Sequence, residues 1–345
     1  MNNKRKKLPY LYVNKEVVRR NIDKMQQKAL KSGTLFRPHF KTHQSLEVAS
    51  IYRQAGISKI TVSSIEMAIF FASAGFDDIT IGIPANLNLI EEINDLADKI
   101  HLNIVLSDVT TALEKINDLS GNLKIYIEID TGYKRSGIDI KNKNDISFLY
   151  RKIQDAGKEF AGFFSHFGNT YSAKSPQEIL AIYHDSVQKL IDLKKQYNTL
   201  ISIGDTPSSS LLESFEGVDE IRPGNFVYND LMQYNLGVCD ISDIAVYMVA
   251  TVIAKYPERN ELVLHAGAVH LSKEYIKLNG QKIYGKIAEL NKNAIQGITP
   301  GATLVSLSQE HAIVACSDDF FNTVNLYDNL AVIPVHSCLT ANLMK

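Results

Sequence analysis

The sequence predicts an α/β protein that consists of a (β/α)8, TIM-like barrel followed by a C-terminal β-rich domain. Through about residue 240, eight short apolar strand patterns alternate with amphipathic helix patterns, as in a closed barrel of parallel strands. From about Asp243 onward, strand patterns follow one another without long helices between them. A doubly wound open sheet is the alternative arrangement for the first part.

The barrel strands are predicted from short apolar runs that end in polar or glycine-containing loops. They are expected at residues 34–40, 59–63, 78–83, 100–106, 123–130, 160–167, 200–204 and 220–223. Helices between them keep apolar residues at helical spacing, as in 89–100 and 179–191. Ser107 and Asp108 are expected to cap a further helix over 109–119.

The second domain is predicted from six further strand patterns. They are expected at 245–254, 261–265, 282–287, 303–306, 313–315 and 330–335. The segment 10–13 precedes the barrel and is expected to join the sheet of the second domain. We therefore predict a barrel domain over 14–240 and a β-domain formed by 1–13 and 241–345.

Composition excludes several classes of protein. The 37 basic and 38 acidic residues balance, which argues against a nucleic acid or a membrane surface as partner. No apolar stretch approaches the ~20 residues that cross a bilayer, and no apolar segment follows the basic run in residues 1–7. Three scattered cysteines form no disulfide framework, and Cys239 and Cys316 are interpreted as packing residues. We expect a cytoplasmic enzyme with a small-molecule substrate.

Lys41 is the first candidate for chemistry. It ends the first predicted strand, in the run 37–43, between a proline and two histidines. Burial and nearby cationic groups would lower the pKa of its amine and give the neutral nucleophile that a Schiff-base lysine needs. Most lysines are solvated surface groups, so the assignment depends on what lies opposite.

Two loops supply a candidate phosphate site. Residues 204–210 and 222–225 follow the seventh and eighth strands, where barrels of this type often hold phosphate. Glycine allows backbone N–H groups to approach an anion, and the hydroxyl of Thr206 adds a donor. Two ordinary turns are the alternative. A lysine facing a phosphate site is what pyridoxal phosphate (PLP) requires.

The loops after the fifth and sixth strands, 130–137 and 165–171, add polar and aromatic groups at the same edge. They are expected to bind a ring hydroxyl, a ring nitrogen or a carboxylate, although each could be a plain loop.

His336 and Cys338 form a candidate metal site after the last strand. Residues two apart in an extended segment point to the same side, so imidazole and thiolate could face one zinc ion. A structural cysteine beside a histidine is the alternative. His311 could line the same pocket, while His265 and His270 stay open between an active-site and a structural role.

The order of these motifs resembles the family of D-threonine aldolases and eukaryotic-type D-serine dehydratases, of the alanine-racemase-like fold (fold type III PLP enzymes). The motifs are Pro38-His39-Phe40-Lys41-Thr42-His43, His166-Phe167-Gly168-Asn169-Thr170-Tyr171, Gly204-Asp205-Thr206-Pro207, Arg222-Pro223-Gly224-Asn225, Ser308-Gln309-Glu310-His311 and His336-Ser337-Cys338-Leu339-Thr340. The resemblance implies a homodimer in which Lys41 carries PLP and His336 with Cys338 holds the metal. It implies cofactor-binding roles for Arg135, His166, Tyr171, Thr206, Gly224, Asn225 and Tyr228.

Cys338 directs the functional prediction within that family. The dehydratases resemble this chain in having cysteine as second metal ligand, where the aldolases typically have aspartate. We therefore expect zinc, with manganese as alternative, and a D-serine dehydratase that forms pyruvate and ammonia. A D-threonine aldolase is the alternative, then a racemase or a non-catalytic PLP-binding protein. The chain differs from the family at His265-Ala266-Gly267, where Asp-x-Gly is usual, and at Glu310-His311-Ala312, where Glu-His-Gly is usual.

Overall fold

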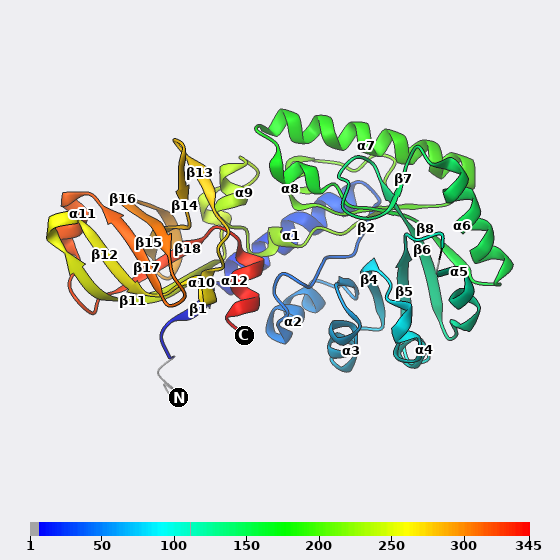
Figure 1. Cartoon of the computed structure of the whole chain (residues 1–345), viewed down its shortest axis with the longest axis horizontal. Helices are drawn as coiled ribbons and strands as arrows, with labels where there is room; N and C mark the ends of the chain where they lie inside the picture. Colours follow the sequence, from blue (N-terminus) through cyan, green and yellow to red (C-terminus); the bar gives the residue numbers. More distant parts are fainter. Residues whose placement is uncertain (1–6, 111) are drawn as a thin grey trace. The chain divides into compact units, whose positions relative to one another are not determined.

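The computed structural model describes residues 7–110 and 112–345, so most of the basic run at 1–7 lies outside it. The chain forms two compact units (Figure 1). The barrel unit comprises Ile22–Gly224, and the β unit comprises the chain before Ile22 together with Asn225–Lys345. Helix α1 (Lys15–Lys31) crosses from one to the other.

Eight parallel strands form the barrel, in the order β2-β10-β9-β8-β6-β5-β4-β3. Their bounds are β2 (Leu35–Phe36), β3 (Lys59–Val62), β4 (Asp78–Pro84), β5 (His101–Leu106), β6 (Leu123–Asp130), β8 (Glu159–Ser165), β9 (Ile201–Ile203) and β10 (Glu220–Ile221). A bridge between His39 and Thr61 joins the two ends of this order, with Phe40 N donating to Thr61 O at 2.8 Å. The barrel prediction is confirmed, and the open sheet is excluded.

The first strand is shorter than the predicted 34–40. Arg37 N and His39 N still donate to the β10 side, at Ile221 O and Pro223 O, but Pro38 between them has no N–H to donate. The regular ladder therefore ends at Phe36, and the chain continues as an extended segment toward Lys41.

Helices cover the outside of the barrel (Figure 1). They are α2 (Leu46–Gln54), α3 (Ile65–Ser73), α4 (Ile90–Ala97), α5 (Ala112–Lys115), α6 (Lys143–Asp155), α7 (Pro176–Tyr197) and α8 (Thr206–Leu211). The helix predicted over 109–119 is shorter, because Asp108 Oδ1 accepts from Thr110 N at 2.9 Å in a local turn, and α5 gives way to a 3-10 turn at Ile116–Asp118. Position 111 lies outside the described residues.

A chain of buried charges runs through the barrel interior. Arg37 contacts Glu220 Oε2 through Nε at 2.6 Å and Asp78 Oδ1 through Nη1 at 2.5 Å. Ser202 Oγ donates to Glu220 Oε1 and accepts from Arg222 Nε, both at 2.6 Å. Burial opposes the charge on Arg37, but Glu220 and Asp78 hold its pKa above the ordinary value. The network links the residue after β10 to the first residue of β4.

The β unit contains a seven-stranded sheet in the order β1-β11-β12-β17-β16-β15-β18, and β18 also pairs with β11. The strands are β1 (Tyr10–Val13), β11 (Val246–Tyr256), β12 (Glu261–His265), β15 (Gly285–Asn291), β16 (Ala294–Leu307), β17 (His311–Cys316) and β18 (Asn329–Pro334). The predicted pairing of 10–13 with this sheet is confirmed, since β1 lies antiparallel to β11. A small hairpin, β13 (Ile276–Leu278) with β14 (Gln281–Ile283), stands beside the sheet.

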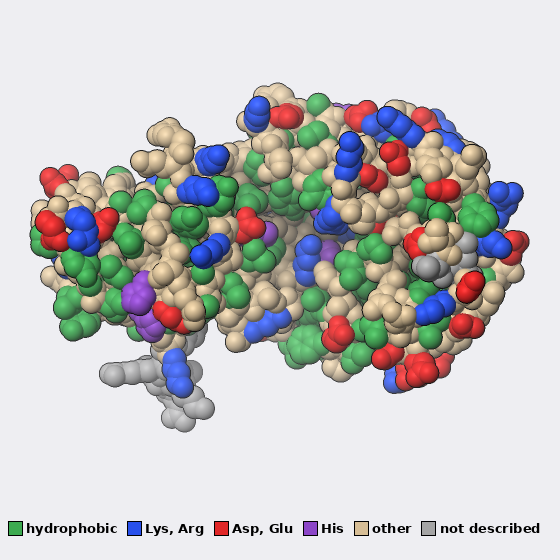
Figure 2. Space-filling view, in the orientation of Figure 1, with side chains coloured by type: hydrophobic (Ala, Val, Ile, Leu, Met, Phe, Trp, Pro, Cys, Tyr) green, Lys and Arg blue, Asp and Glu red, His purple; other side chains and the backbone are tan. Residues whose placement is uncertain are grey.

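Short helices complete the β unit: α9 (Leu231–Asn235), α10 (Ala268–Leu271), α11 (Asp318–Thr323) and α12 (Ser337–Leu343). Alternate apolar side chains from one face of the closed ladder form its core, with Met248, Leu264 and Val332 fully buried, and the other face packs in a second cluster that includes Tyr247 and Ile333. Basic and acidic side chains intermingle on the surface shown in Figure 2, as the balanced composition predicts. Within the described residues, no helix has the length and apolar character of a membrane span.

Candidate active site

Lys41 follows the bridge that closes the barrel. Its backbone N–H lies 3.4 Å from Nδ1 of His39, which is buried, whereas the Lys41 side chain is exposed. Burial of the amine, expected from the sequence, is therefore absent in this chain. The other expected feature, a cationic neighbourhood, is present around His39.

Four cationic or potentially cationic groups gather around His39. Burial lowers the pKa of His39 well below the ordinary value, and the charges of Lys41, Arg222, His166 and Arg135 lower it further. The same causes, burial first and Arg135 next, lower the pKa of His166 to about 3. Both imidazoles are neutral at pH 7, and the remaining positive charge favours an anionic ligand.

His166 has a defined tautomer. Its Nδ1 contacts the carbonyl oxygen of Gly204, which can only accept, so Nδ1 carries the hydrogen and Nε2 keeps a free lone pair. The ring of Tyr133 meets His166 edge-on, with centroids 5.7 Å apart. Tyr133 also occupies the space beside Gly168, where a Cβ would not fit. The loops after β6 and β8 are thus packed against each other.

The sequence predicts Thr206 in a loop. In the structure Thr206 is instead the first residue of helix α8. Asp205 caps the helix, since its carboxylate accepts from Ser208 N at 2.7 Å. Thr206 N donates to the Tyr171 hydroxyl at 3.2 Å, which brings two predicted cofactor residues together. The Thr206 hydroxyl oxygen is buried and has no hydrogen-bond partner among the described residues.

Gly224 lies against the Lys41 segment. A Cβ at this position would be 3.0 Å from His39 O and 3.0 Å from Thr42 Oγ1. Two predicted elements, the lysine segment after β2 and the glycine after β10, therefore approach each other so closely that any larger residue would have to displace its neighbours.

Arg222 is a further candidate site residue. It lies in a motif identified from the sequence, but the sequence alone assigns it no function. Its guanidinium stacks on Phe164, 3.2 Å from the ring centroid, and donates through Nη2 to Ser165 O at 2.7 Å. Burial lowers its pKa to about 10, so it remains charged at neutral pH. The signal that could have identified it is its position directly after the eighth strand.

These observations fit pyridoxal phosphate. The phosphate needs hydroxyl and backbone donors and a positive surrounding, and the unpartnered Thr206 hydroxyl, the tight approach at Gly224 and the cationic groups meet those needs. Lys41, in the segment next to Gly224, would supply the amine for covalent attachment.

His336 and Cys338 lie at a strand-to-helix junction of the β unit. The predicted extended geometry is wrong, because β18 ends at Pro334 and α12 begins at Ser337, with His336 as its N-cap residue. The two side chains are nevertheless paired. Burial opposes charge on His336, but hydrogen bonding to Cys338 and the charges of Cys338, Asp230 and Glu274 raise its pKa to about 9.

The donor set fits a soft divalent metal. Nδ1 of His336 is buried without a hydrogen-bond partner in the described chain, and the neighbouring thiol supplies sulfur. Among residues 7–110 and 112–345, no group of three or more His, Cys, Asp or Glu side chains is arranged to hold a metal. Two protein ligands leave the other coordination positions to water or substrate.

Asn225 and Tyr228, predicted to bind cofactor, belong to the β unit. Asn225 Nδ2 donates to Asp230 Oδ2 at 2.7 Å and lies 3.5 Å from Cys338 Sγ, so it contacts the candidate metal pair. Tyr228 is almost completely buried.

His265 and His311 stand directly opposite each other on β12 and β17. Nδ1 of His270 accepts from Gly267 N at 3.1 Å, and its Nε2 is 3.9 Å from Glu310 Oε2. The backbone contact gives His270 a structural function in the turn before α10, while His265 and His311 are exposed.

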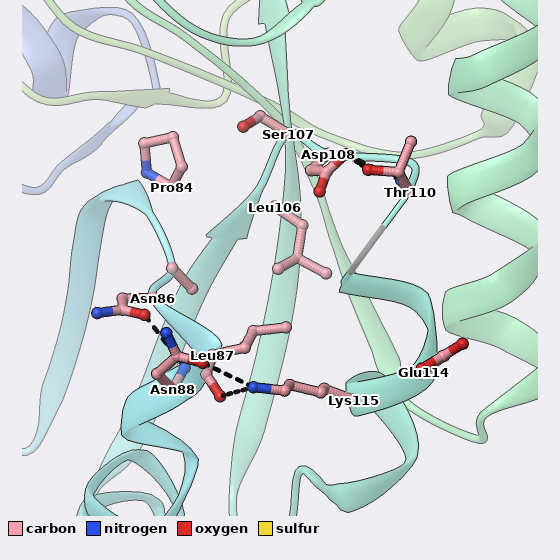
Figure 3. A pocket seen from close by; sticks show the side chains of 11 residues that line it. Pro84, Asn86, Leu87, Asn88, Leu106, Ser107, Asp108, Thr110, Glu114 and Lys115 are labelled. Atoms are coloured by element: carbon pink, nitrogen blue, oxygen red, sulfur yellow. Dashed lines mark hydrogen bonds between the residues drawn. The ribbon is translucent and has the colours of Figure 1, made fainter.

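A cavity of about 610 Å³ opens between the loops that follow β4 and β5 (Figure 3). Lys115 Nζ donates to Asn88 Oδ1 at 2.8 Å across it, and Asp108 accepts from the Thr110 hydroxyl at its rim. None of its lining residues is a predicted site residue.

Comparison with known proteins identifies the family. The profile of the alanine racemase N-terminal domain matches residues 13–231, and that of a serine dehydratase domain matches 245–345. A D-serine dehydratase of Dictyostelium discoideum is 30% identical over 96% of this chain and 90% of its own length. The chain belongs to the D-serine dehydratase family. This is a family of pyridoxal phosphate-dependent lyases, and the resemblance inferred from the motifs is confirmed.

Solved structures of the D-serine dehydratase family agree with the fold. The D-threo-3-hydroxyaspartate dehydratase from Delftia sp. HT23 has a TM-score of 0.89 at 28% identity, covering 97% of this chain and 92% of that one. Variants of that enzyme include a histidine-to-alanine form and a cysteine-to-alanine form that is metal-free. The two replaced residues are two positions apart, the same spacing as His336 and Cys338. D-threonine aldolase from Filomicrobium marinum, 19% identical with a TM-score of 0.79, shares the fold.

Proposed function

We propose that this protein is a PLP-dependent, metal-assisted lyase that eliminates water from D-3-hydroxy amino acids, after which the unsaturated amine takes up water and releases ammonia, so that D-serine as substrate gives pyruvate and ammonia. The observation that carries the proposal is the pairing of Cys338 with His336 at the end of β18 in a chain of this family. The chemistry of the ligands favours zinc, because imidazole and thiolate suit this metal. A cytoplasmic homodimer is part of the same proposal.

The barrel unit would hold the cofactor. Lys41 is proposed to attach it, with Thr206, Gly224 and Tyr171 at its phosphate. Arg135 and Arg222 would supply donors and positive charge, and His166 would supply the acceptor nitrogen Nε2. Asn225, whose Nδ2 lies 3.5 Å from Cys338 Sγ, and Tyr228 are retained as cofactor-binding candidates from the family resemblance.

The reaction divides between the two sets of residues. PLP supplies an electron sink for charge that develops at the substrate α-carbon, and the metal supplies a Lewis acid for the leaving hydroxyl. The Lys41 amine would take the proton from the α-carbon, and the cationic groups around His39 would favour an anionic substrate. His336 and Cys338 would hold the metal and leave it open positions.

An assay of the purified protein with PLP and zinc tests this function. D-Serine should yield pyruvate and ammonia in equal amounts, while L-serine should not react. Release of glycine and acetaldehyde from D-threonine, without pyruvate from D-serine, would instead identify an aldolase.

A substitution at Gly224 tests the phosphate site. In Gly224→Val the side chain would meet His39 O and Thr42 Oγ1, so the lysine segment must shift and PLP affinity should fall at least about 10-fold. Cofactor absorbance during PLP titration measures this. Gly297→Val is the matched control, since Gly297 lies in β16 without a positive φ and a Cβ there would meet only the flexible Glu289 side chain. Equal PLP affinity in Gly224→Val and the control would contradict the phosphate placement.

A further inference from the structure

We propose that Asp230 is the positioning residue of the metal pair: its carboxylate fixes the backbone between His336 and Cys338 and thereby sets metal affinity. This inference rests on the proposed function, because it assumes that the pair binds metal. It concerns the β unit alone, in which all of these residues lie.

Asp230 is completely buried at the start of helix α9. Its Oδ1 accepts from Gln233 N at 2.9 Å, as an N-cap residue does. Its Oδ2 accepts from Ser337 N at 2.9 Å and from Asn225 Nδ2 at 2.7 Å. A carboxylate with three donors can remain charged in a buried position.

Asp230 Oδ2 contacts the backbone between the two metal ligands directly and approaches Cys338 through Asn225. Ser337 is the residue between the two ligands, so its N–H ties the junction of β18 and α12 to Asp230. Asn225, held by the same oxygen, extends its amide to within 3.5 Å of Cys338 Sγ. Neither contact is needed to cap α9. Partners of this kind orient metal ligands, and their loss typically costs about 10- to 100-fold in metal affinity.

The polar atoms around Asp230 indicate a region that is completed by a ligand. Six buried side-chain atoms without hydrogen-bond partners lie in the described segments 225–233 and 336–337: Asn225 Oδ1, Asn229 Oδ1, Gln233 Nε2, Gln233 Oε1, His336 Nδ1 and Ser337 Oγ. Buried polar groups are normally paired, with protein, water or ion. Asp230 is the anionic group among them, and a buried negative charge favours a nearby cation.

Asp230→Ser separates the two functions of the carboxylate. Serine keeps a hydroxyl that can cap α9 but has no second oxygen for Ser337 and Asn225. Metal affinity of the full-length protein should be measured by competition with a chromophoric chelator, for zinc and for cobalt. We expect about a 10- to 100-fold weaker affinity and a weaker or shifted thiolate-to-cobalt absorption band.

Two further variants make the test decisive. Ser317→Ala removes the N-cap side chain of α11 in the same unit, which takes no part in the hydrogen bonds of Asp230, and should leave affinity and the cobalt band unchanged. Asp230→Asn keeps the shape of the side chain but loses the charge and one acceptor oxygen, so it should also weaken metal binding. It provides the test if the serine variant does not fold. Wild-type affinity and an unaltered cobalt band in either folded Asp230 variant would overturn the inference while leaving the metal pair in place. Absence of metal binding in the wild type would instead remove the metal part of the proposed function.

Discussion

Replacing Lys41 with alanine should abolish turnover of D-serine, with kcat reduced by at least about 10³-fold. Lys41 is the lysine whose charge acts on both His39 and His166 at the ends of the barrel strands, and it lies in the segment that Gly224 touches. The variant loses the amine that attaches PLP and moves the α-proton. Steady-state pyruvate formation measures the loss.

We expect the Lys41→Ala variant to keep cofactor binding although it loses turnover. The phosphate-binding groups remain, so Lys41→Ala should still bind PLP, but borohydride should no longer fix the cofactor to the protein. In the wild type, reduction and peptide mapping should label Lys41. Lys174→Ala is the control, an exposed lysine just before α7 that should keep full activity. Label on another lysine would refute the assignment.

Replacing Cys338 with alanine should remove the metal and, with it, dehydration. Without the thiolate, His336 is the remaining protein ligand of the pair, and affinity should fall by more than the about 100-fold that outer contacts are worth. Metal content after dialysis and pyruvate formation from D-serine measure the two effects. Covalent attachment of PLP to Lys41 should persist, because its residues lie in the barrel unit.

Cys239→Ala is the matched control for this experiment, since Cys239 is also a partly buried cysteine of the β unit. It should retain metal and activity. Full D-serine turnover in metal-depleted Cys338→Ala would show that the pair is structural and would exclude metal-assisted dehydration.

Much of the fold follows from local patterns. The strand at 123–130 was predicted to the residue, because a long apolar run ends in the turn-forming Asp130-Thr131-Gly132. The short first strand could not be predicted from the sequence. Pro38 has no N–H to donate, and which carbonyl group on a neighbouring strand therefore lacks a donor depends on the folded barrel. Closure through His39 and Thr61 is likewise a tertiary pairing with no sequence pattern of its own.

The sequence identified which residue types form the candidate site, but it did not predict their backbone conformation or exposure. Motif order identified His336 and Cys338, but the extended backbone assumed for them gives way to the start of α12. Exposure of the Lys41 side chain also differs from expectation. Asp230 escaped notice because its contacts with Ser337 join positions 107 residues apart. Asn229-Asp230 before an apolar run was the available signal, and it indicates only a helix cap.

The ion chain inside the barrel restricts how this sequence can diverge. Removing Arg37 or Glu220 alone leaves a partner charged and buried, which typically costs about 3–5 kcal/mol. Replacing the whole set with apolar residues of similar volume can be nearly neutral, but that change requires several substitutions at once. A sequence with these charges and one without them would therefore be separated by destabilised single-substitution intermediates. Arg222 is connected to these buried charges through Ser202. Substitutions in the barrel interior would therefore also affect the candidate cofactor site.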